Sequence, residues 1–329
     1  MRAARSIAGG ALALLLAALL APLAVRAENS QFNIALATGP DSPQNVVAKE
    51  VAAAIVKDTG GRVAAKVFDS GQLGQTDALL QAMITGGGVQ ATITVVTDTI
   101  CPPTKLFLAP YAFPDRAAAY AALDGAAAQP IYAACRKNGY DFVAAWDSGF
   151  RQLSTNKPVN ALADVKGLKV RVPNGALWLD TFRDLGANPT PMGIAGLYSA
   201  LQQGVVDGQE QPIANYYAGK YMEVQKYFAI TSHMYGPAFF IVSTQWLATL
   251  PADLREVVVR DIRAATERQR KLSESDEVSE LQEVQDKYHV TVTHPDLTPF
   301  KAATAPTRDK VAGDLPDFAK ALGADSGSK

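Results

Sequence analysis

The sequence predicts an α/β protein with two lobes. Strand-like and helix-like segments alternate along the chain, beginning with a strand at 32–36 and a helix at 45–59. In addition, 302 residues follow an apolar N-terminal segment (1–27), which is more than one small core usually organises. Strands and helices that alternate in this way predict parallel strands covered by helices, with ligands bound beyond the carboxyl ends of the strands.

Residues 1–27 have the pattern of a secretory signal peptide. Arg2 and Arg5 precede an apolar run at 7–25, and Ala27 ends a cleavage-like site. A membrane anchor is the alternative, because the run is almost long enough to span a bilayer. We expect cleavage near Glu28 and a periplasmic mature protein.

The charge of the mature chain argues against a nucleic-acid partner. Removing the three arginines of residues 1–27 from 31 basic residues leaves 28, against 32 acidic residues, for a net charge of -4. No block of like charge stands out, so neither nucleic acid nor a membrane surface is an expected partner.

The first half of the mature chain continues the strand–helix alternation. Its predicted strands are 32–36, 63–68 and 89–96, and its helices are 45–59 and 73–84. Glycine clusters follow both helices. The loops after the three strands (37–42, 70–72 and 95–98) are expected on one rim of the sheet.

The second half contains further strands and one long predicted helix. Strands are expected at 141–146, 168–172, 239–243 and 290–293, and shorter helices at 178–185 and 198–203. No proline or glycine interrupts 252–287, so this stretch is predicted as a single helix that begins at Pro251. Its middle, 266–277, is mostly polar, as expected where a helix crosses between lobes.

Cys101 and Cys135 are the two cysteines of the chain. An oxidising compartment permits a disulfide between them, and two unpaired or buried thiols are the alternative. Their spacing matches neither a zinc site nor a redox motif, and no metal is expected.

Enzyme motifs are missing from the sequence. It contains no GxSxG, HExxH, GxxxxGK[ST] or GxGxxG. His233, His289 and His294 are expected to pack or to lie at the surface. Asp207 and Glu210 are expected to cap a turn or to pair with a nearby base. No catalysis and no cofactor are therefore expected.

Two arginines lie among apolar or small residues near strand ends. Arg171 is one residue before the end of 168–172, and Arg151 follows the strand at 141–146. An arginine at the carboxyl end of a strand faces the crevice where ligands bind in open α/β sheets. Its planar fork suits a bidentate grip on a carboxylate, whereas an internal ion pair is the structural alternative.

Nearly the whole mature chain is covered by a set of motifs in this order: GQLG (71–74), WDSGFR (146–151), GLKVRVPN (167–174), LGANPTPM (185–192), YSALQ (198–202), GVVDGQE (204–210), EVQKY (223–227) and HPDL (294–297). With this ordered set the sequence resembles the extracytoplasmic solute-binding subunits of TRAP transporters, the C4-dicarboxylate and organic-acid binding family.

The resemblance implies a two-lobed periplasmic binding protein fold with crossing hinge strands and one long helix spanning both lobes. The expected division is 28–148 with 237–276 for lobe I, and 149–236 with 277–329 for lobe II.

The resemblance also implies ligand-binding residues. In this family the arginine at the Arg171 position forms the main salt bridge with a ligand carboxylate, and the one at the Arg151 position assists it. The family's asparagine that contacts the same carboxylate is replaced here by Gln211, and Asn174 ends the segment that contains Arg171.

Selectivity in this family comes mainly from the rim of the first lobe. Here Ala37, Thr38, Thr76 and Val95 occupy that rim, with Val96 and Asp98 beside them. Ala37 and Val95 offer no hydrogen bond, which favours a small or partly apolar carboxylate over a polyhydroxylated one. Aromatic residues are expected either to add a wall to the pocket or to pack in the core; they are Trp146, Phe150 and Tyr235.

We therefore expect a monomeric solute-binding protein that captures an organic acid and delivers it to integral membrane subunits. The alternatives are a binding subunit of an ABC importer or sensor system, a periplasmic enzyme on the same scaffold, and a dimeric member of the family.

Overall fold

The computed structural model describes residues 29–322, which form one nine-stranded sheet flanked by helices. The strand order is β2-β1-β3-β8-β4-β7-β5-β6, and β9 pairs with β8. The predicted signal peptide lies outside the described residues. Within those residues, no helix is both long enough and apolar enough to cross a bilayer.

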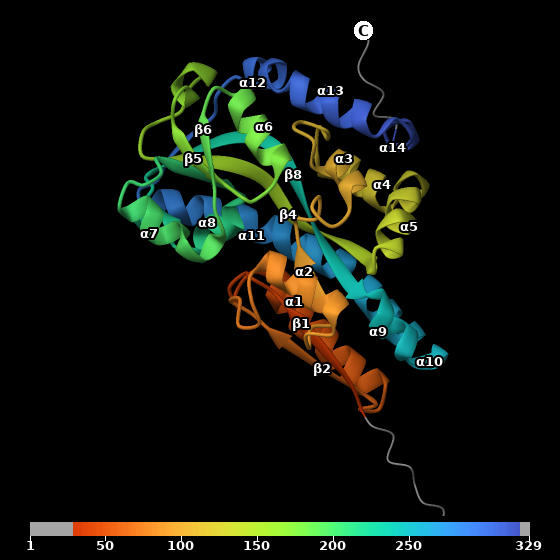
Figure 1. Cartoon of the computed structure of the whole chain (residues 1–329). Coiled ribbons are helices and arrows are strands. Elements are labelled where there is room, and N and C mark those ends of the chain that lie inside the picture. Colours follow the sequence, from red (N-terminus) through yellow and green to blue (C-terminus); the bar gives the residue numbers. More distant parts are fainter. Residues whose placement is uncertain (1–28, 323–329) are drawn as a thin grey trace, which may run out of the picture.

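The first lobe contains the amino-terminal strands and their helices, in the lower part of Figure 1. β1 runs parallel to both β2 and β3, as the strand–helix alternation predicts. Ser42 caps α1 by accepting a hydrogen bond from the Asn45 backbone N–H, and Pro43 occupies its first turn. The elements are β1 (Ser30–Ala35), α1 (Pro43–Asp58), β2 (Val63–Phe68), α2 (Thr76–Thr85), β3 (Ala91–Thr94), α9 (Thr244–Thr249) and α10 (Ala252–Ala264).

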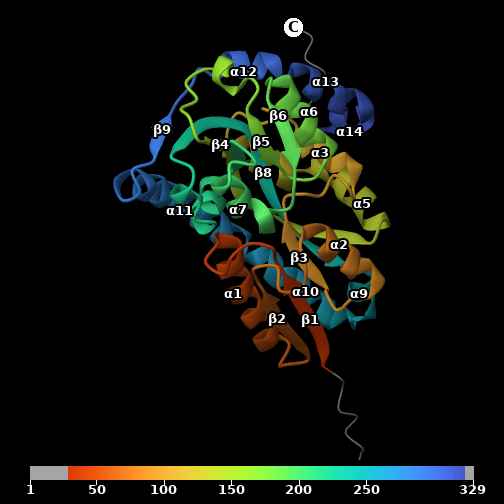
Figure 2. The same cartoon turned by 60° about the vertical axis from the view of Figure 1, so that its left-hand side comes forward.

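The second lobe is built on the parallel strands β5, β6 and β7. α6 covers β5 and β6, and α13 packs on the outside of α6. In Figure 2 the helices α12–α14 lie over the far end of this lobe. The elements are β5 (Lys169–Val172), α6 (Ala176–Asp184), β6 (Asn188–Pro191), α7 (Leu197–Gln202), β7 (Gly208–Gln211), α8 (Ile213–Ala218), β9 (Thr291–Thr293), α12 (Thr298–Ala303), α13 (Ala305–Asp314) and α14 (Pro316–Ala321).

Two long antiparallel strands, β4 (Tyr140–Thr155) and β8 (Tyr227–Ser243), pass from one lobe to the other (Figure 1). They are much longer than the predicted strands at 141–146 and 239–243. Their pairing continues through a bulge between Asp147 and Phe150, where Gly149 adopts a φ of +90°. The bulge contains a glycine and polar residues, so it interrupts the alternation of apolar and polar residues that predicts a strand. For this reason the sequence of this segment is typical of a loop. Arg151, expected just beyond a strand, therefore lies inside β4.

The helix predicted over 251–287 is in fact two helices. α10 ends at Ala264, and α11 (Thr266–Asp286) begins after a turn at Ala265. Both helices pack on α1 and on β4, whereas α11 also packs on α8 of the second lobe. The break falls where the packing surface changes, and no proline or glycine marks it in the sequence. The expected lobe boundaries, at 148/149, 236/237 and 276/277, fall within β4, β8 and α11.

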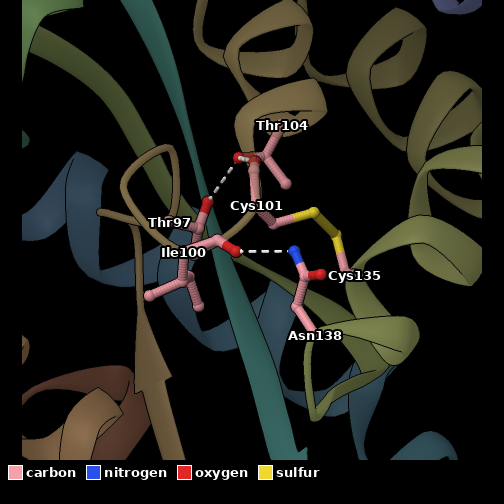
Figure 3. The surroundings of a disulfide bond; sticks show 6 residues. All are labelled: Thr97, Ile100, Cys101, Thr104, Cys135 and Asn138. Carbon is pink, nitrogen blue, oxygen red and sulfur yellow. Dashed lines mark hydrogen bonds between the residues drawn. A yellow bond between two sulfur atoms is a disulfide. The ribbon is translucent and has the colours of Figure 1, made fainter.

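Cys101 and Cys135 form a disulfide, which resolves the alternative left open by the sequence (Figure 3). It joins the loop after β3 to α5, and the Asn138 side chain reinforces this link by donating a hydrogen bond to the Ile100 carbonyl. The disulfide belongs to a helical insertion that packs on β4 and β8 and also touches α13 and α14. Its helices are α3 (Lys105–Leu108), α4 (Arg116–Asp124) and α5 (Gln129–Lys137).

Removing this disulfide should destabilise the protein. The cysteines are 34 residues apart, and closing a loop of that length in the unfolded chain corresponds to roughly 3–4 kcal/mol. Urea unfolding of Cys101→Ser/Cys135→Ser should show a free energy of unfolding lower by about this amount. The double variant is also the control, since a reductant should destabilise the wild type and leave the variant unchanged. Equal stability of the two proteins would contradict the prediction.

Candidate ligand-binding site

The candidate site is a cavity of about 170 Å³ between the lobes. It is lined from the first lobe by residues at the ends of β1 and β3 and the start of α2, and from the second lobe by the ends of β5, β6 and β7. This is the edge at which ligands bind in open α/β sheets. Seven of the predicted ligand-binding residues line it: Thr38, Thr76, Val95, Arg151, Arg171, Asn174 and Gln211.

Arg171 projects from β5 and is only 4% exposed. Its Nε donates a hydrogen bond to the Met192 carbonyl oxygen at 2.9 Å. Among the described residues, no carboxylate lies within salt-bridge distance of this guanidinium. Burial lowers the pKa of Arg171 to about 10, although Glu210 opposes this shift. A buried cation without a paired anion is costly, so the site is suited to an anion supplied by a ligand.

Arg151 differs from Arg171 because it has an internal partner. Its Nε and Nη2 donate to the two carboxylate oxygens of Glu210 at 2.5 and 2.7 Å, and all these atoms are buried. His233 contacts the same carboxylate at 3.2 Å through Nε2. The expected pairing of Glu210 with a base is thus confirmed, and so is the expected packing role of His233. Arg151 still lines the cavity, but Glu210 already neutralises its charge.

The ionisation of this trio follows from its surroundings. Burial by itself would raise the pKa of Glu210, but Arg151 and His233 outweigh burial and lower that pKa below its usual value. Burial lowers the pKa of His233, and Glu210 only partly opposes the shift. A neutral imidazole beside the Arg151–Glu210 pair is the resulting arrangement.

Gln211 ends β7 on the floor of the cavity and is 1% exposed. Neither its Oε1 nor its Nε2 has a hydrogen-bond partner among the described residues. A buried carboxamide without partners costs free energy, which a polar ligand can recover. Asn174 has a different environment: its Nδ2 donates to Asp77 of α2 at 3.3 Å, which forms a contact between the lobes.

The expected aromatic wall is absent from the residues that line this cavity. Trp146 is completely buried and packs edge-on against Phe240 in the core between the sheet and its helices. Tyr235 is 2% exposed, and its hydroxyl donates to the Asp147 carboxylate at 2.7 Å. Phe150 borders a separate surface cavity. The core-packing alternative therefore describes Trp146 and Tyr235, because their strands turn these side chains away from the interlobe edge.

Several lining residues were missed in the sequence. Gln44, Gln75, Ser148 and Asn215 supply most of the additional polar groups. Gln44 follows the predicted rim loop at 37–42 and lies in the first turn of α1. A polar residue in the first turn of a helix is common, so the sequence does not indicate that Gln44 lines the cavity. Its position there depends on how α1 packs against the hinge.

A buried network holds the crossing strands next to this cavity. The Asp147 carboxylate accepts hydrogen bonds from Arg116 and Tyr235. The Gln269 side chain of α11 accepts a hydrogen bond from the Asp147 backbone N–H and donates one to the Asp147 carbonyl. Arg116 also pairs with Glu277 of α11. The network thus attaches the bulge of β4 to the helix that runs beneath both lobes. No cluster of potential metal ligands occurs within residues 29–322.

The sequence matches the family described as bacterial extracellular solute-binding protein, family 7, over residues 34–314. The chain belongs to this family. It is 28% identical over 289 residues to the 2,3-diketo-L-gulonate-binding periplasmic protein of Escherichia coli, covering 87% of this chain and 88% of that protein. It is 30% identical over 241 residues to the C4-dicarboxylate-binding periplasmic protein of Vibrio cholerae, covering 73% and 72%.

Solved structures of the same family agree with the fold. A TRAP periplasmic solute-binding protein from Xanthobacter autotrophicus Py2, with bound β-D-galacturonate, superposes with a TM-score of 0.86. The two chains are 26% identical, and the match covers 91% of this chain and 100% of the other. The predicted membership in the TRAP solute-binding family and the predicted two-lobed α/β fold are confirmed.

The two arginines should respond oppositely to substitution. Arg151→Met leaves the Glu210 carboxylate buried without its partner and should lower the free energy of unfolding by about 3–5 kcal/mol. Arg171→Met removes a cation that has no internal anion, so stability should change by less than about 1 kcal/mol or should rise. Urea unfolding without ligand measures both.

The double variant Arg151→Met/Glu210→Gln provides the control, because it removes both charges and should recover part of the lost stability. A large destabilisation by Arg171→Met would contradict the assignment of Arg171 as the unpaired cation.

Acid should destabilise the protein through His233. The folded state lowers the pKa of His233, so the unfolded chain binds its proton more tightly. This contribution to stability is complete above the unfolded pKa, near 6.5, and is lost as pH falls below it, by up to about 1.4 kcal/mol per pH unit. Thermal unfolding between pH 8 and pH 5 should show a shallower decline for His233→Asn than for the wild type. Parallel declines would rule out His233 as the source.

Proposed function

We propose that this protein captures a small organic acid in the interlobe cavity through a salt bridge between the ligand carboxylate and Arg171. The observation that carries the proposal is a buried guanidinium, at the carboxyl end of a strand, with no acidic partner among the described residues. A ligand carboxylate would supply the missing anion and receive two parallel N–H···O bonds from its planar fork.

Arg151 and Gln211 complete the anion site in this proposal. Arg151 adds positive potential at the cavity wall, but its ion pair with Glu210 makes it a secondary contact. Gln211 donates from Nε2 to the same carboxylate, in the place of the family's asparagine, and its unpartnered buried amide supports this role. Thr38, Thr76, Val95 and Asn174 bound the ligand from the rim.

Ligand capture is proposed to close the two lobes. The crossing strands β4 and β8 bend at the bulge near Gly149, and α11 carries the motion beneath both lobes. Closure excludes water and strengthens the ion pair with the ligand. The Asn174–Asp77 hydrogen bond, which already joins the lobes in this structure, would help to hold the closed form.

The proposed physiological setting follows the family. We infer that residues 1–27 direct export and are removed, and that the mature protein works in the periplasm as a monomer. Its closed form delivers the acid to integral membrane subunits of a TRAP transporter. Relatives bind 2,3-diketo-L-gulonate, C4-dicarboxylates and β-D-galacturonate by name, so the ligand class proposed here is an organic acid of this size range.

A thermal-shift screen of residues 28–329 against organic acids, followed by calorimetry, tests the proposal. A ligand at about one hundred times its Kd should stabilise the protein by roughly 2.7 kcal/mol. Arg171→Ala should weaken binding of the best acid by roughly 100-fold or more, and Arg171→Lys by roughly 10- to 100-fold, since lysine lacks the bidentate fork.

Arg183→Lys is the matched control, because this arginine is exposed on α6 and pairs only with Asp180 in the structure. Its binding should equal that of the wild type. Near-normal affinity of Arg171→Ala for the same acid would refute the salt bridge. Refolding the protein before the screen removes any ligand carried through purification.

A further inference from the structure

We propose that Gln44 makes this site selective for acids that carry a hydroxyl group beside the carboxylate. This inference rests on the proposed function, since it assumes that the carboxylate binds at Arg171. In this inference Arg171 of the second lobe binds the carboxylate, and Gln44 of the first lobe binds the hydroxyl group.

Gln44 lines the cavity from the first turn of α1 and is 5% exposed. Its Nε2 donates a hydrogen bond to the Asp147 backbone carbonyl at 3.1 Å. Its Oε1 is buried and has no donor among the described residues. The amide nitrogen of Gln44 is therefore hydrogen-bonded within the fold, whereas its amide oxygen is an acceptor without a donor among the described residues.

The orientation of this carboxamide follows from its neighbours. A backbone carbonyl can only accept, so the amide nitrogen of Gln44 must be the end that faces Asp147. The Gln269 side chain holds that same peptide by donating to the Asp147 carbonyl at 2.8 Å and accepting from the Asp147 N–H at 2.7 Å. A flipped Gln44 would set two oxygens against each other. The acceptor is thus positioned by the hinge itself.

Three neighbouring residues of the first-lobe rim do not replace this acceptor. Ala37 and Val95 have no polar side chain. The Thr38 hydroxyl oxygen already accepts hydrogen bonds from Asn45 at 2.9 Å and from Ser42 at 3.2 Å. Thr38 can therefore still donate, but its capacity to accept is filled.

A second buried acceptor lies on the opposite lobe. No donor to the Oε1 of Gln211 occurs among the described residues, and if its Nε2 binds the ligand carboxylate, this oxygen still needs one. Donors from a carboxylic acid at neutral pH are its hydroxyl groups, because the ionised carboxylate only accepts. A hydroxyl group of the acid donates to one of these buried oxygens, whereas the corresponding deoxy acid leaves that oxygen desolvated and unpaired. This conclusion differs from the partly apolar ligand that Ala37 and Val95 suggest in sequence.

The test compares matched acids that differ by one hydroxyl group. The pairs are malate with succinate, lactate with propionate, and glycerate with 3-hydroxypropionate, each titrated calorimetrically into the refolded mature protein. Leaving one buried acceptor unpaired corresponds to roughly a tenfold loss of affinity or more, so the hydroxy member of the binding pair should bind at least about tenfold tighter.

Gln44→Leu removes the acceptor at similar side-chain size. We expect the hydroxy-to-deoxy affinity ratio to fall to within about threefold, with the deoxy acid bound as well as before. Gln81→Leu is the matched control, since Gln81 is an exposed glutamine of α2 that does not line the cavity. Its ratio should match that of the wild type. A general loss of both acids in Gln44→Leu would indicate a structural role and would overturn the inference.

Failure of this inference differs from failure of the proposed function. Equal affinity for both members of each pair in the wild type, with binding still abolished by Arg171→Ala, would overturn the hydroxyl selectivity and keep the salt bridge. An unchanged ratio in Gln44→Leu would do the same. Binding that is unaffected by Arg171→Ala would refute the proposed function, and this inference would fall with it.

Discussion

Two buried arginines line one interlobe cavity, and the structure treats them differently. Arg151 is neutralised by Glu210, which is itself buried and shared with His233. Within residues 29–322, Arg171 has only the Met192 backbone carbonyl as a hydrogen-bond partner. The free-energy cost of burying a charge depends on whether the charge is paired. Arg151 is therefore stabilised within the fold, whereas Arg171 is a buried cation that an anion from outside the fold would stabilise. The proposed carboxylate site depends on this difference between the two arginines.

The fold places Arg171 and its cavity next to the strands that cross between the lobes. β4 and β8 belong to both lobes, and the bulge at Gly149 bends them where the cavity begins. Asp147, beside the bulge, is held by groups from α4, β8 and α11, so the backbone at the hinge is well defined. Gln44 binds the same Asp147 carbonyl. Contacts to the ligand and contacts to the hinge therefore share one peptide group.

The cavity also combines charge with unfilled neutral groups. A cation alone would accept any small anion, and Coulomb attraction discriminates little between acids of equal charge. Buried carboxamides discriminate more sharply, because a ligand that fails to pair with them leaves a desolvated dipole. In the proposed function, Arg171 provides affinity for carboxylates as a class, and Gln44 and Gln211 provide selection among them.

The sequence determined the local features of this protein. The bounds of β2 were predicted to the residue, and the helices at 45–59 and 178–185 lie within a few residues of α1 and α6, because apolar periodicity and glycine ends are local signals. The position of Arg171 at the end of an apolar strand, and the family motifs around it, predicted a residue of the interlobe cavity, and Arg171 does line that cavity. Tertiary structure decided what depends on distant partners. It paired Arg151 with Glu210, joined Cys101 to Cys135, extended β4 and β8 through a polar bulge, and divided the long helix at Ala265. It also placed Gln44 against the hinge. The role of a glutamine in a helix depends on the group that its amide contacts, and here that group is the distant Asp147 carbonyl.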